Sequence, residues 1–473
     1  MADVTFLDAD FAPATEADWR ALIDKTLGEA PFSSLEKTTV EGLPIAPLYG
    51  PAPMPAAPAR AVPADRAWEV ATLIAHPDPA RANAEILADL RGGAAAAVLR
   101  IDPTGKTGIA AGSAADLTRA LDGVILEFAP VALDAGFLGP QAADWLAAAA
   151  KASPSARLHF HLDPLSALAE AGASPGPIEA HLISAANVAA RLAETYPQAQ
   201  LFLASGRVVH EAGGGEAGEV AFAAAAGLAY AKAQVRAGLP MAQTFARITL
   251  GLSADADYFL TIAKLRAARA VWARIAGPCE ADPTARIEAR SSRRMLTAKD
   301  AWTNMIRLTA AGFGAAVGGA DRVILGNFTD ALGLPTEFAR RQSRNAQLVL
   351  MEEAHIGRVA DPAAGAGYVE ALTDQIARAA WAEFQAIEAA GGIVAALTSG
   401  HIAQAVAAAN AARTADPKII GVTAFPPAKD AAVEVEMAAA KAVSAPATRL
   451  PGRDSVCPPL TPMRVSEPYE VAQ

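Results

Sequence analysis

Cysteine, basic clusters and long hydrophobic runs are all scarce in this sequence. Its 473 residues include only two cysteines, Cys279 and Cys457, which cannot form a disulfide framework or a cysteine-rich metal site. The 40 lysines and arginines are scattered, and the formal net charge is −10. Because an acidic chain without a basic patch binds nucleic acid and anionic lipid poorly, we expect neither nucleic acid nor a membrane as a partner.

The sequence also shows little sign of a targeting or membrane-spanning segment. Residues 1–10 carry acidic side chains and no basic stretch before an apolar core, so they do not resemble a signal peptide. The most apolar stretch, residues 220–230, is short and rich in alanine, and Lys232 follows it, which predicts a buried helix. With so few cysteines, the simplest expectation is a cytoplasmic protein.

What is present is an alternation of short apolar runs with long alanine-rich helical patterns. The eight runs are residues 96–101, 124–128, 158–162, 201–204, 247–252, 286–289, 322–327 and 358–360. Helical patterns between them include residues 255–275, 299–317 and 336–353. Strands that alternate with helices pair in parallel, because each helix returns the chain to the same edge. We therefore predict an α/β fold, a closed (β/α)₈ TIM barrel, with an open doubly wound sheet as the alternative.

Three regions are expected along the chain. Residues 1–65 form an N-terminal arm, with a short helix near residues 19–27 and a Pro/Ala-rich linker at its end. Residues 66–425 hold the barrel, and a strand-like piece at residues 418–423 lies near its end. Residues 426–473 lose all periodicity and are predicted to form an irregular C-terminal tail.

The pair His159 and His161 is the most suggestive local motif. Two residues apart on a strand, both imidazoles share a face and could converge on a metal ion, as in a barrel hydrolase. Such a site needs further histidines at the ends of later strands, and residues 252–255 and 290–292 supply none. A polar pair inside the barrel is the favoured interpretation, and a metal-dependent hydrolase remains a distant third hypothesis.

Other candidate motifs have simpler interpretations. Glycines at residues 312–319 follow a helix, whereas the dinucleotide fingerprint needs a strand, then glycines, then a helix. Lys264, Arg266 and Arg269 are expected on a solvated helix face, and Asp361 is a lone carboxylate after the eighth predicted strand. No carboxylate pair, Ser-His-Asp set or Walker loop is found, so we assign no catalytic, cofactor-binding or metal-binding residue.

An ordered set of residues resembles the acyl-CoA mutase barrel of the methylmalonyl-CoA mutase family. The set includes Leu296-Thr297, Asp300, Asn304, Arg307, Gly318-Gly319, Leu334-Pro335-Thr336, Arg344-Asn345, Gln347, Glu353, Asp361-Pro362, Gly365 and Tyr368-Val369-Glu370. Residues 257–259 and 263–269 resemble a helix of the same barrel. The resemblance spans about residues 15–425, and it implies the barrel fold and adenosylcobalamin-dependent interconversion of methylmalonyl-CoA and succinyl-CoA.

Departures from that family pattern carry most of the functional information. Catalytic members have Ser-Gly-Tyr-His where this chain has Ser205-Gly206-Arg207-Val208, and valine cannot donate a hydrogen bond to the substrate carbonyl. A substrate-contacting tyrosine is replaced by Pro63, and His-Thr-Asn is replaced by residues 325–327, Leu-Gly-Asn. Together these losses predict a barrel that is not itself catalytic.

The resemblance also bears on cofactor and partner. The cobalamin domain of catalytic members carries Asp-x-His-x-x-Gly, but His401 is the only histidine after residue 400 and has no aspartate two residues before it. Residues 353–362 look most similar to the small subunits of heterodimeric mutases. The resemblance therefore implies a non-catalytic small subunit that binds no cobalamin, paired with a large subunit that binds adenosylcobalamin and the acyl-CoA substrate.

Two structural expectations and one alternative follow from this interpretation. Residues 1–50 are expected to contact the large subunit, and aliphatic or aromatic strand residues are expected to fill the barrel interior. The alternative is a catalytic acyl-CoA mutase barrel that works with a separate cobalamin-binding chain.

Overall fold

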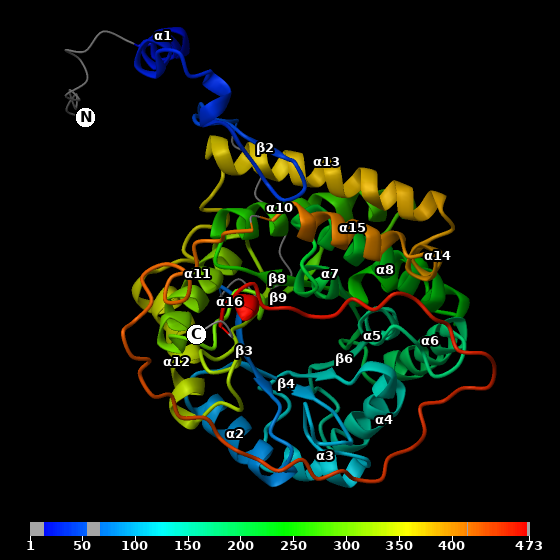
Figure 1. Cartoon of the computed structure of the whole chain (residues 1–473). Helices are drawn as coiled ribbons and strands as arrows, with labels where there is room; N and C mark the ends of the chain where they lie inside the picture. Colours follow the sequence, from blue (N-terminus) through cyan, green and yellow to red (C-terminus); the bar gives the residue numbers. More distant parts are fainter. Residues whose placement is uncertain (1–13, 54–66, 414, 471–473) are drawn as a thin grey trace, which may run out of the picture.

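A closed ring of eight parallel strands forms the centre of the molecule (Figure 1). The structure is a computed structural model, and it describes residues 14–53, 67–413 and 415–470. The barrel strands are β3 (Glu69–Ile74), β4 (Ala96–Arg100), β5 (Val131–Asp134), β6 (Leu158–Leu162), β7 (Gln200–Ser205), β8 (Ile248–Ala254), β9 (Arg286–Ser291) and β10 (Arg322–Ile324). Strand β10 pairs with both β9 and β3 and so closes the ring. The predicted (β/α)₈ barrel is confirmed.

Three predicted strand segments, residues 124–128, 358–360 and 418–423, are wrong, and two real strands were missed. Residues 124–128 form turns in which Ile125 and Phe128 are 59% and 76% exposed, so this apolar run is not buried. Residues 358–360 and 418–423 form bends and turns. The missed strands are β3, which follows the linker, and β5, which comes a few residues after the false strand. The pair His159 and His161 therefore lies on the fourth barrel strand, and Ser205-Gly206 follows the fifth.

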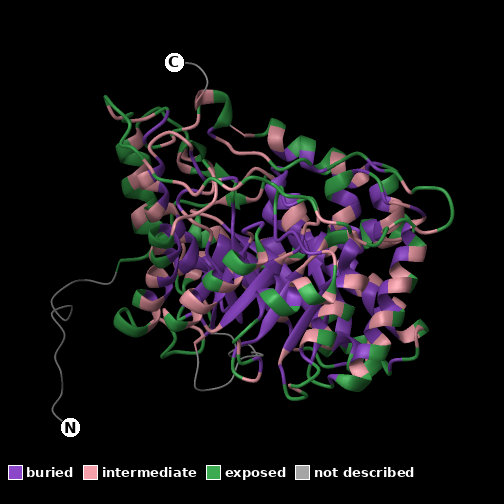
Figure 2. Cartoon of the chain, turned by 90° about the horizontal axis from the view of Figure 1, so that it is seen from below, coloured by how far each residue is buried: buried purple, intermediate pink, exposed green. Residues whose placement is uncertain are grey.

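Helices surround the barrel and carry its hydrophobic core (Figures 1 and 2). The longer ones are α2 (Pro79–Arg91), α4 (Gly139–Ala149), α6 (Ile178–Thr195), α8 (Glu216–Arg236), α10 (Tyr258–Ala276), α11 (Asn304–Val317), α12 (Glu337–Leu348), α13 (Gly367–Ala389) and α15 (His401–Ala411). The shorter helices around the barrel are α3 (Ala114–Ala120), α5 (Pro164–Ala171), α7 (Arg207–Glu211), α9 (Met241–Thr244), α14 (Ile393–Thr398) and α16 (Glu467–Glu470). In the described part of the chain, none of the helices combines the length and hydrophobicity that a bilayer crossing requires.

Local sequence explains where several helices begin. Asp78 caps α2 by accepting hydrogen bonds from the backbone N–H groups of residues 80 and 81, and Pro79 occupies the first helical position. Asp257 and Thr336 cap α10 and α12 in the same way. Each such cap stabilises its helix by about 1 kcal/mol.

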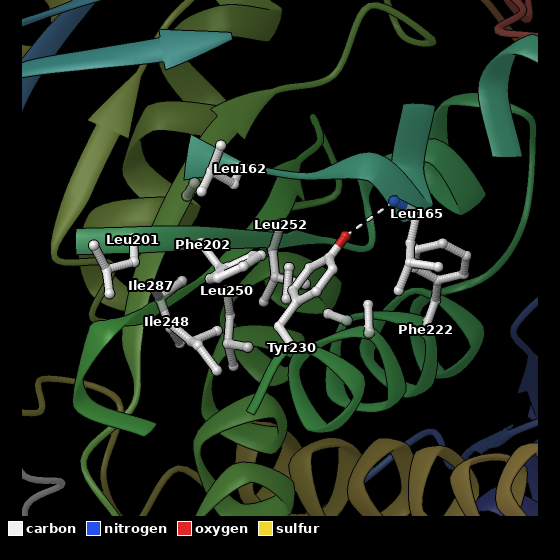
Figure 3. Packing of buried hydrophobic residues seen from close by; sticks show 14 of the residues in the cluster. Leu162, Leu165, Leu201, Phe202, Phe222, Tyr230, Ile248, Leu250, Leu252 and Ile287 are labelled. Carbon is white, nitrogen blue, oxygen red and sulfur yellow. Dashed lines mark hydrogen bonds between the residues drawn. The ribbon is translucent and has the colours of Figure 1, made fainter. Parts of the chain in front are cut away.

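The outer faces of β7 and β8 pack against α8 (Figure 3). The rings of Phe202 and Tyr230 stack with centroids 4.7 Å apart, and both side chains are fully buried. The Tyr230 hydroxyl accepts a hydrogen bond from the Leu165 backbone N–H and donates one to Asp163. Because alanines line α8, the helix can approach the strands closely, which explains the alanine-rich stretch seen in the sequence.

Charged as well as aliphatic side chains fill the barrel interior. Arg322 on β10 binds Glu69 on β3 at 2.8 Å and reaches across to the His159 Nε2 atom at 3.0 Å. It also pairs with Glu288 on β9 at 3.5 Å. Val98 and Ile324 of the predicted runs form a buried aliphatic cluster with Ala71, Ala96 and Ala132, and Ile324 shares a strand face with Arg322. Phe202, in contrast, faces α8 outside the barrel.

The N-terminal arm lies partly on its own barrel and partly away from it. Helix α1 (Glu16–Leu27) contains no buried residue and stands clear of the barrel in Figure 1. Beyond it, β1 (Lys37–Thr38) and β2 (Pro44–Ile45) form a small hairpin. Between these strands, the Glu41 carboxylate accepts hydrogen bonds from the backbone N–H groups of Ala217 and Gly218, both at 2.9 Å. Glu41 thus binds the N-terminus of α8, where a negative charge is favoured.

The C-terminal tail wraps around the rim formed by the loops that follow the strands; we call residues 433–466 the belt (the orange-to-red segment in Figure 1). Its backbone bonds successive rim loops: Glu436 to Leu334, Val443 to Pro103, Leu450 to Pro175, Leu460 to Ala169, Met463 to Glu211 and Val465 to Arg294. These contacts follow the carboxyl ends of β10, β4, β6, β7 and β9. The belt therefore edges the face at which barrel enzymes place their active sites.

Candidate functional site

A cavity of about 510 Å³ opens at the carboxyl ends of the barrel strands. Its polar lining comes from the ends of four strands and the start of α7, and includes Arg100, Asp134, His161, Arg290 and Arg207. Leu460 and Pro462 of the belt close one side. A second, much smaller cavity of about 10 Å³ lies beside Arg322 and shares no lining residue with the first. A cavity of this volume at this face suits a small ligand.

Asp134 organises the floor of the cavity. Arg100 binds its Oδ2 atom at 3.1 Å and Arg290 binds the same atom at 3.0 Å. Burial alone would raise the pKa of Asp134, but the two guanidinium groups hold that pKa well below its ordinary value. Asp134 therefore stays ionised, and its charge is already shared between two cations.

Arg207 is the third arginine at this floor, and it differs from the other two. Among the described residues, its guanidinium has no hydrogen-bond or ion-pair partner, and its Nε atom is buried. Burial and the nearby charge of Arg290 lower the pKa of Arg207 to about 10, although Glu211 and Asp134 act in the opposite direction. The next residue, Val208, lines the same cavity with an apolar side chain.

The structure gives His159 and His161 different neighbours. Their rings meet edge to face with centroids 5.5 Å apart, and His159 faces Arg322. Burial lowers the pKa of His161 to about 4, so its ring is neutral near pH 7, and neither nitrogen has a partner. Among the residues that the structure describes, no group of three or more histidine, cysteine or acidic side chains could hold a metal ion. The hydrolase hypothesis thus gains no support.

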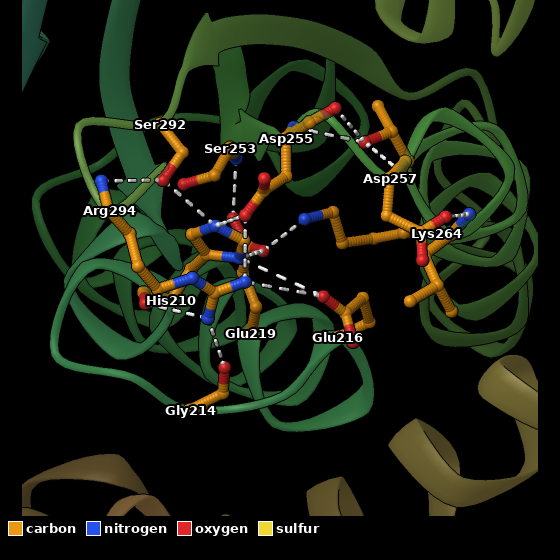
Figure 4. Close-up of polar contacts among 12 residues, drawn as sticks. His210, Gly214, Glu216, Glu219, Ser253, Asp255, Asp257, Lys264, Ser292 and Arg294 are labelled. Carbon is orange, nitrogen blue, oxygen red and sulfur yellow. Dashed lines mark hydrogen bonds and ion pairs between the residues drawn. The ribbon is translucent and has the colours of Figure 1, made fainter. Parts of the chain in front are cut away.

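A second buried polar cluster was not predicted (Figure 4). Fully buried His210 lies between Glu219, 3.3 Å from its Nδ1 atom, and Asp255, 3.1 Å from its Nε2 atom. Lys264 binds Glu219 at 2.5 Å, and Arg294 binds Asp255 at 2.9 Å. Burial alone would raise the pKa of Glu219, but Lys264 and His210 lower it to about 2. Every charge here has an opposite neighbour, so the cluster connects α7, α8, α10 and β9 as a structural unit.

This cluster and its neighbours correct the expected solvated helix face. Lys264 is fully buried, and Arg269 is 7% exposed and binds Asp321 at 3.0 Å. Arg266 pairs with Asp361 and Glu370. Asp361 does not follow a strand at all; it lies in the loop before α13 and serves as a partner for Arg266. The sequence did carry a signal of this burial. Alanine and leucine occur all around α10 and not on one side alone, which is typical of a buried helix.

Comparison with known proteins identifies the family to which this site belongs. Residues 50–450 match the family model of methylmalonyl-CoA mutase. The chain belongs to the methylmalonyl-CoA mutase family. It is 39% identical over 466 residues to a methylmalonyl-CoA mutase small subunit of Streptomyces virginiae, covering 92% of this chain and 74% of that relative.

Other relatives include proteins named small subunits and proteins named simply methylmalonyl-CoA mutase. The methylmalonyl-CoA mutase small subunit of Propionibacterium freudenreichii subsp. shermanii is 35% identical over 438 residues, which cover 86% of this chain and 67% of the relative. The protein named methylmalonyl-CoA mutase of Rhizobium meliloti is 28% identical over 425 residues, covering 82% and 60%. Over more than four fifths of this chain, the identity is thus higher to these two proteins named small subunits than to the Rhizobium meliloti protein.

Within the mutase family, the remaining departures fall at structural positions. Leu325 is buried in the core, and the Gly326 backbone N–H donates to the Ser291 hydroxyl at 2.7 Å. The Asn327 side chain donates to Asp330 at 3.1 Å. Pro63 lies outside the described residues. Residues 325–327 thus make packing and hydrogen-bond contacts within the loop that follows β10 and with the end of β9.

The family depends on adenosylcobalamin, and the groups at the cavity can be tested against that cofactor. His401, which lacks the aspartate of the cobalamin motif, begins α15 and pairs with Glu383 at 2.7 Å. His161 lies on the floor beneath the arginines and is 4% exposed. A cavity of about 510 Å³ suits a drug-sized ligand or a smaller one, whereas a corrinoid is far larger. The described residues of this cavity therefore do not fit a cobalamin.

Proposed function

We propose that this chain is the non-catalytic small subunit of a heterodimeric, adenosylcobalamin-dependent methylmalonyl-CoA mutase. Its partner is a large subunit, which binds adenosylcobalamin and the acyl-CoA and interconverts methylmalonyl-CoA and succinyl-CoA. The small subunit supplies a matching barrel to the assembly. We further propose that the complex works in the cytoplasm.

One observation carries the proposal. Arg207 and Val208 stand at the cavity where the family resemblance implies a tyrosine and a histidine that contact substrate. Valine offers no hydrogen-bond donor to a thioester carbonyl, and Arg207 brings a charge to the place of a neutral ring. The names of the relatives from Streptomyces virginiae and Propionibacterium freudenreichii support a partnership with a large subunit.

The exposed part of the N-terminal arm supports a role in assembly. Helix α1 has a capping box, formed by Thr15 and Asp18, yet buries none of its residues on its own chain. Leu22 on this helix is 64% exposed. Because an isolated helix of 12 residues is marginal in water, a second surface is needed to stabilise it. The large subunit is the proposed source of that surface.

Reconstitution tests the division of labour. The purified chain incubated with adenosylcobalamin and then desalted should be colourless and inactive, and activity should appear only with the large subunit. Stoichiometric cobalamin retained by this chain alone would contradict the proposal. Activity of this chain with a separate cobalamin-binding chain, in the absence of a large subunit, would support the alternative, a catalytic barrel in a split mutase.

A matched pair of surface variants tests the arm. Leu22→Glu places a charge on α1, and Ile183→Glu places one at a similarly exposed position, 62%, on α6. We expect Leu22→Glu to weaken co-elution with the large subunit at least tenfold while its thermal melt is unchanged. Ile183→Glu should leave the complex intact. If only Ile183→Glu weakens the complex, the interface lies on the barrel helices and not on the arm.

A further inference from the structure

The unpaired guanidinium of Arg207 is the feature of the cavity that the assembly role leaves unexplained. The side chain is partly buried beside Arg290, and no described residue accepts a hydrogen bond from it. A half-buried guanidinium that lines a cavity and has no hydrogen-bond partner among the described residues has donors available for an anionic ligand.

The acidic side chains of the cavity are already engaged elsewhere. Arg100 and Arg290 share Asp134. Asp163 accepts from the Tyr230 hydroxyl at 2.5 Å, and Glu211 accepts from the Arg293 backbone N–H at 3.2 Å. Two further acids, Asp102 and Glu170, line the outer part, where Asp102 binds its own loop and Glu170 is exposed. The cavity therefore offers spare donors at Arg207 and few spare acceptors at its floor.

The walls around Arg207 indicate what kind of anion fits. Leu138, Leu203 and Val208 line the cavity on the barrel side, and Leu460 and Pro462 line it on the belt side. Apolar walls around a single charged group favour a ligand with a hydrocarbon part and one anionic head. A guanidinium binds a planar carboxylate through two parallel hydrogen bonds, which also fixes its orientation.

We propose that the cavity at the barrel mouth is a binding site for a small organic carboxylate, held by Arg207 and covered by the apolar residues of the belt. The ligand is distinct from the acyl-CoA that the large subunit converts, and the proposal does not rest on the proposed function. It gives the barrel of this chain a ligand of its own.

Titration calorimetry on the full purified chain tests this site. Butyrate should bind at one saturable site, and its amide, butyramide, should bind at least tenfold more weakly because it lacks the charge. Inorganic phosphate carries charge without a hydrocarbon part and should also bind more weakly than butyrate. Equal affinity for butyrate and butyramide, tighter binding of phosphate, or no saturable binding at millimolar concentrations would overturn the proposal.

Variants assign the binding to Arg207. We expect Arg207→Gln to reduce butyrate affinity at least tenfold, while Arg236→Gln, at an exposed arginine that ends α8 and does not line the cavity, leaves it within twofold. Arg207→Lys keeps the charge but loses the two-pronged geometry, so an intermediate loss is expected, and this variant serves if the glutamine variant does not fold. Undiminished binding by either Arg207 variant would place the anion elsewhere. Because all arms use this chain alone, their failure would leave the subunit assignment intact.

Discussion

The two buried charge clusters of this barrel are close in the fold but differ in how well their charges are matched. Around His210, each cation has a carboxylate within 4 Å, and the carboxylates are bound in turn by Lys264 and Arg294. Around Arg207, one guanidinium has no partner among the residues that the structure describes, and it lies beside a cavity of about 510 Å³. Buried charges that are fully paired, with no cavity beside them, stabilise a fold. A charge without a partner beside a cavity is more typical of a binding site.

The largest effect is expected from breaking the matched cluster. Lys264→Ala removes the fully buried ammonium and leaves Glu219 buried without its cation. Breaking such a pair costs about 3–5 kcal/mol, because the remaining charge is uncompensated. Urea unfolding followed by circular dichroism would measure the loss. A change under about 1 kcal/mol would show that the cluster tolerates an unmatched charge, and the contrast with Arg207 would fail.

Two carboxyl groups should give opposite dependence of stability on pH. The pKa of Glu219 is lowered to about 2, so its contribution is present above the pKa of the unfolded chain and is lost as the pH falls towards 2. Burial raises the pKa of Asp163 to about 7, despite hydrogen bonds from Tyr230 and Ser166. The folded state therefore holds an extra proton between about pH 4 and pH 7, and stability falls as the pH rises through that window.

Asp163→Asn isolates the second of these effects. The amide oxygen can still accept the hydrogen bond from Tyr230, but it carries no charge at any pH. Relative to the parent, the variant should gain stability as the pH rises from 4 to 7, by up to about 4 kcal/mol at 1.36 kcal/mol per pKa unit. Parallel curves of unfolding free energy for both proteins across this range would contradict the raised pKa.

A smaller effect, of opposite sign to Lys264→Ala, is expected at the unmatched cluster. Arg207→Leu removes a partly buried charge that has no partner and places an apolar side chain beside Val208 and Leu203. Stability of the ligand-free chain should rise by about 1 kcal/mol, since apolar replacement of a desolvated charge is often stabilising. A thermal melt of each protein gives the comparison. A lower melting temperature would mean that Arg207 is bound within the chain.

An exposed ion pair should show the smallest effect and serves as a baseline. Arg378 binds Asp374 at 2.7 Å on the outer face of α13, where both side chains are largely exposed. Solvent screens such pairs, so Arg378→Ala should leave the unfolding midpoint unchanged within error. A clear destabilisation by Arg378→Ala would show that the loss of stability in Lys264→Ala does not depend on burial of the ion pair.

Sequence alone predicted the barrel because alternation and burial agree over most of it. Residues 158–162 were predicted as a strand with the bounds that β6 has, whereas residues 124–128 misled because an apolar run can remain exposed. Strand β3 was missed because it follows a linker whose composition masks the start of the barrel. Arg207 and Val208 were identified through the family resemblance, which also showed that they replace a tyrosine and a histidine that contact substrate in catalytic members.

The cavity and the matched cluster could not be predicted, because their members are distant in sequence. Lys264 meets Glu219 across 45 residues, and Arg290 meets Asp134 across 156. Helical spacing places Lys264 on a face but does not say whether that face is covered. Packing of α8 against α10 brings Lys264 to Glu219, and closure of the ring brings Arg290 of β9 across to Asp134 of β5.

The belt gives this barrel an order of assembly. Its contacts join residues as far apart as Arg81 and Glu436, separated by 355 positions, so the ring of rim loops must already be in place before the belt can dock. During synthesis, a ribosome-bound chain would hold a closed barrel whose mouth is still bare while residues 433–466 remain in the exit tunnel. In that interval the mouth lacks the cover that Leu460 and Pro462 give it in the folded chain.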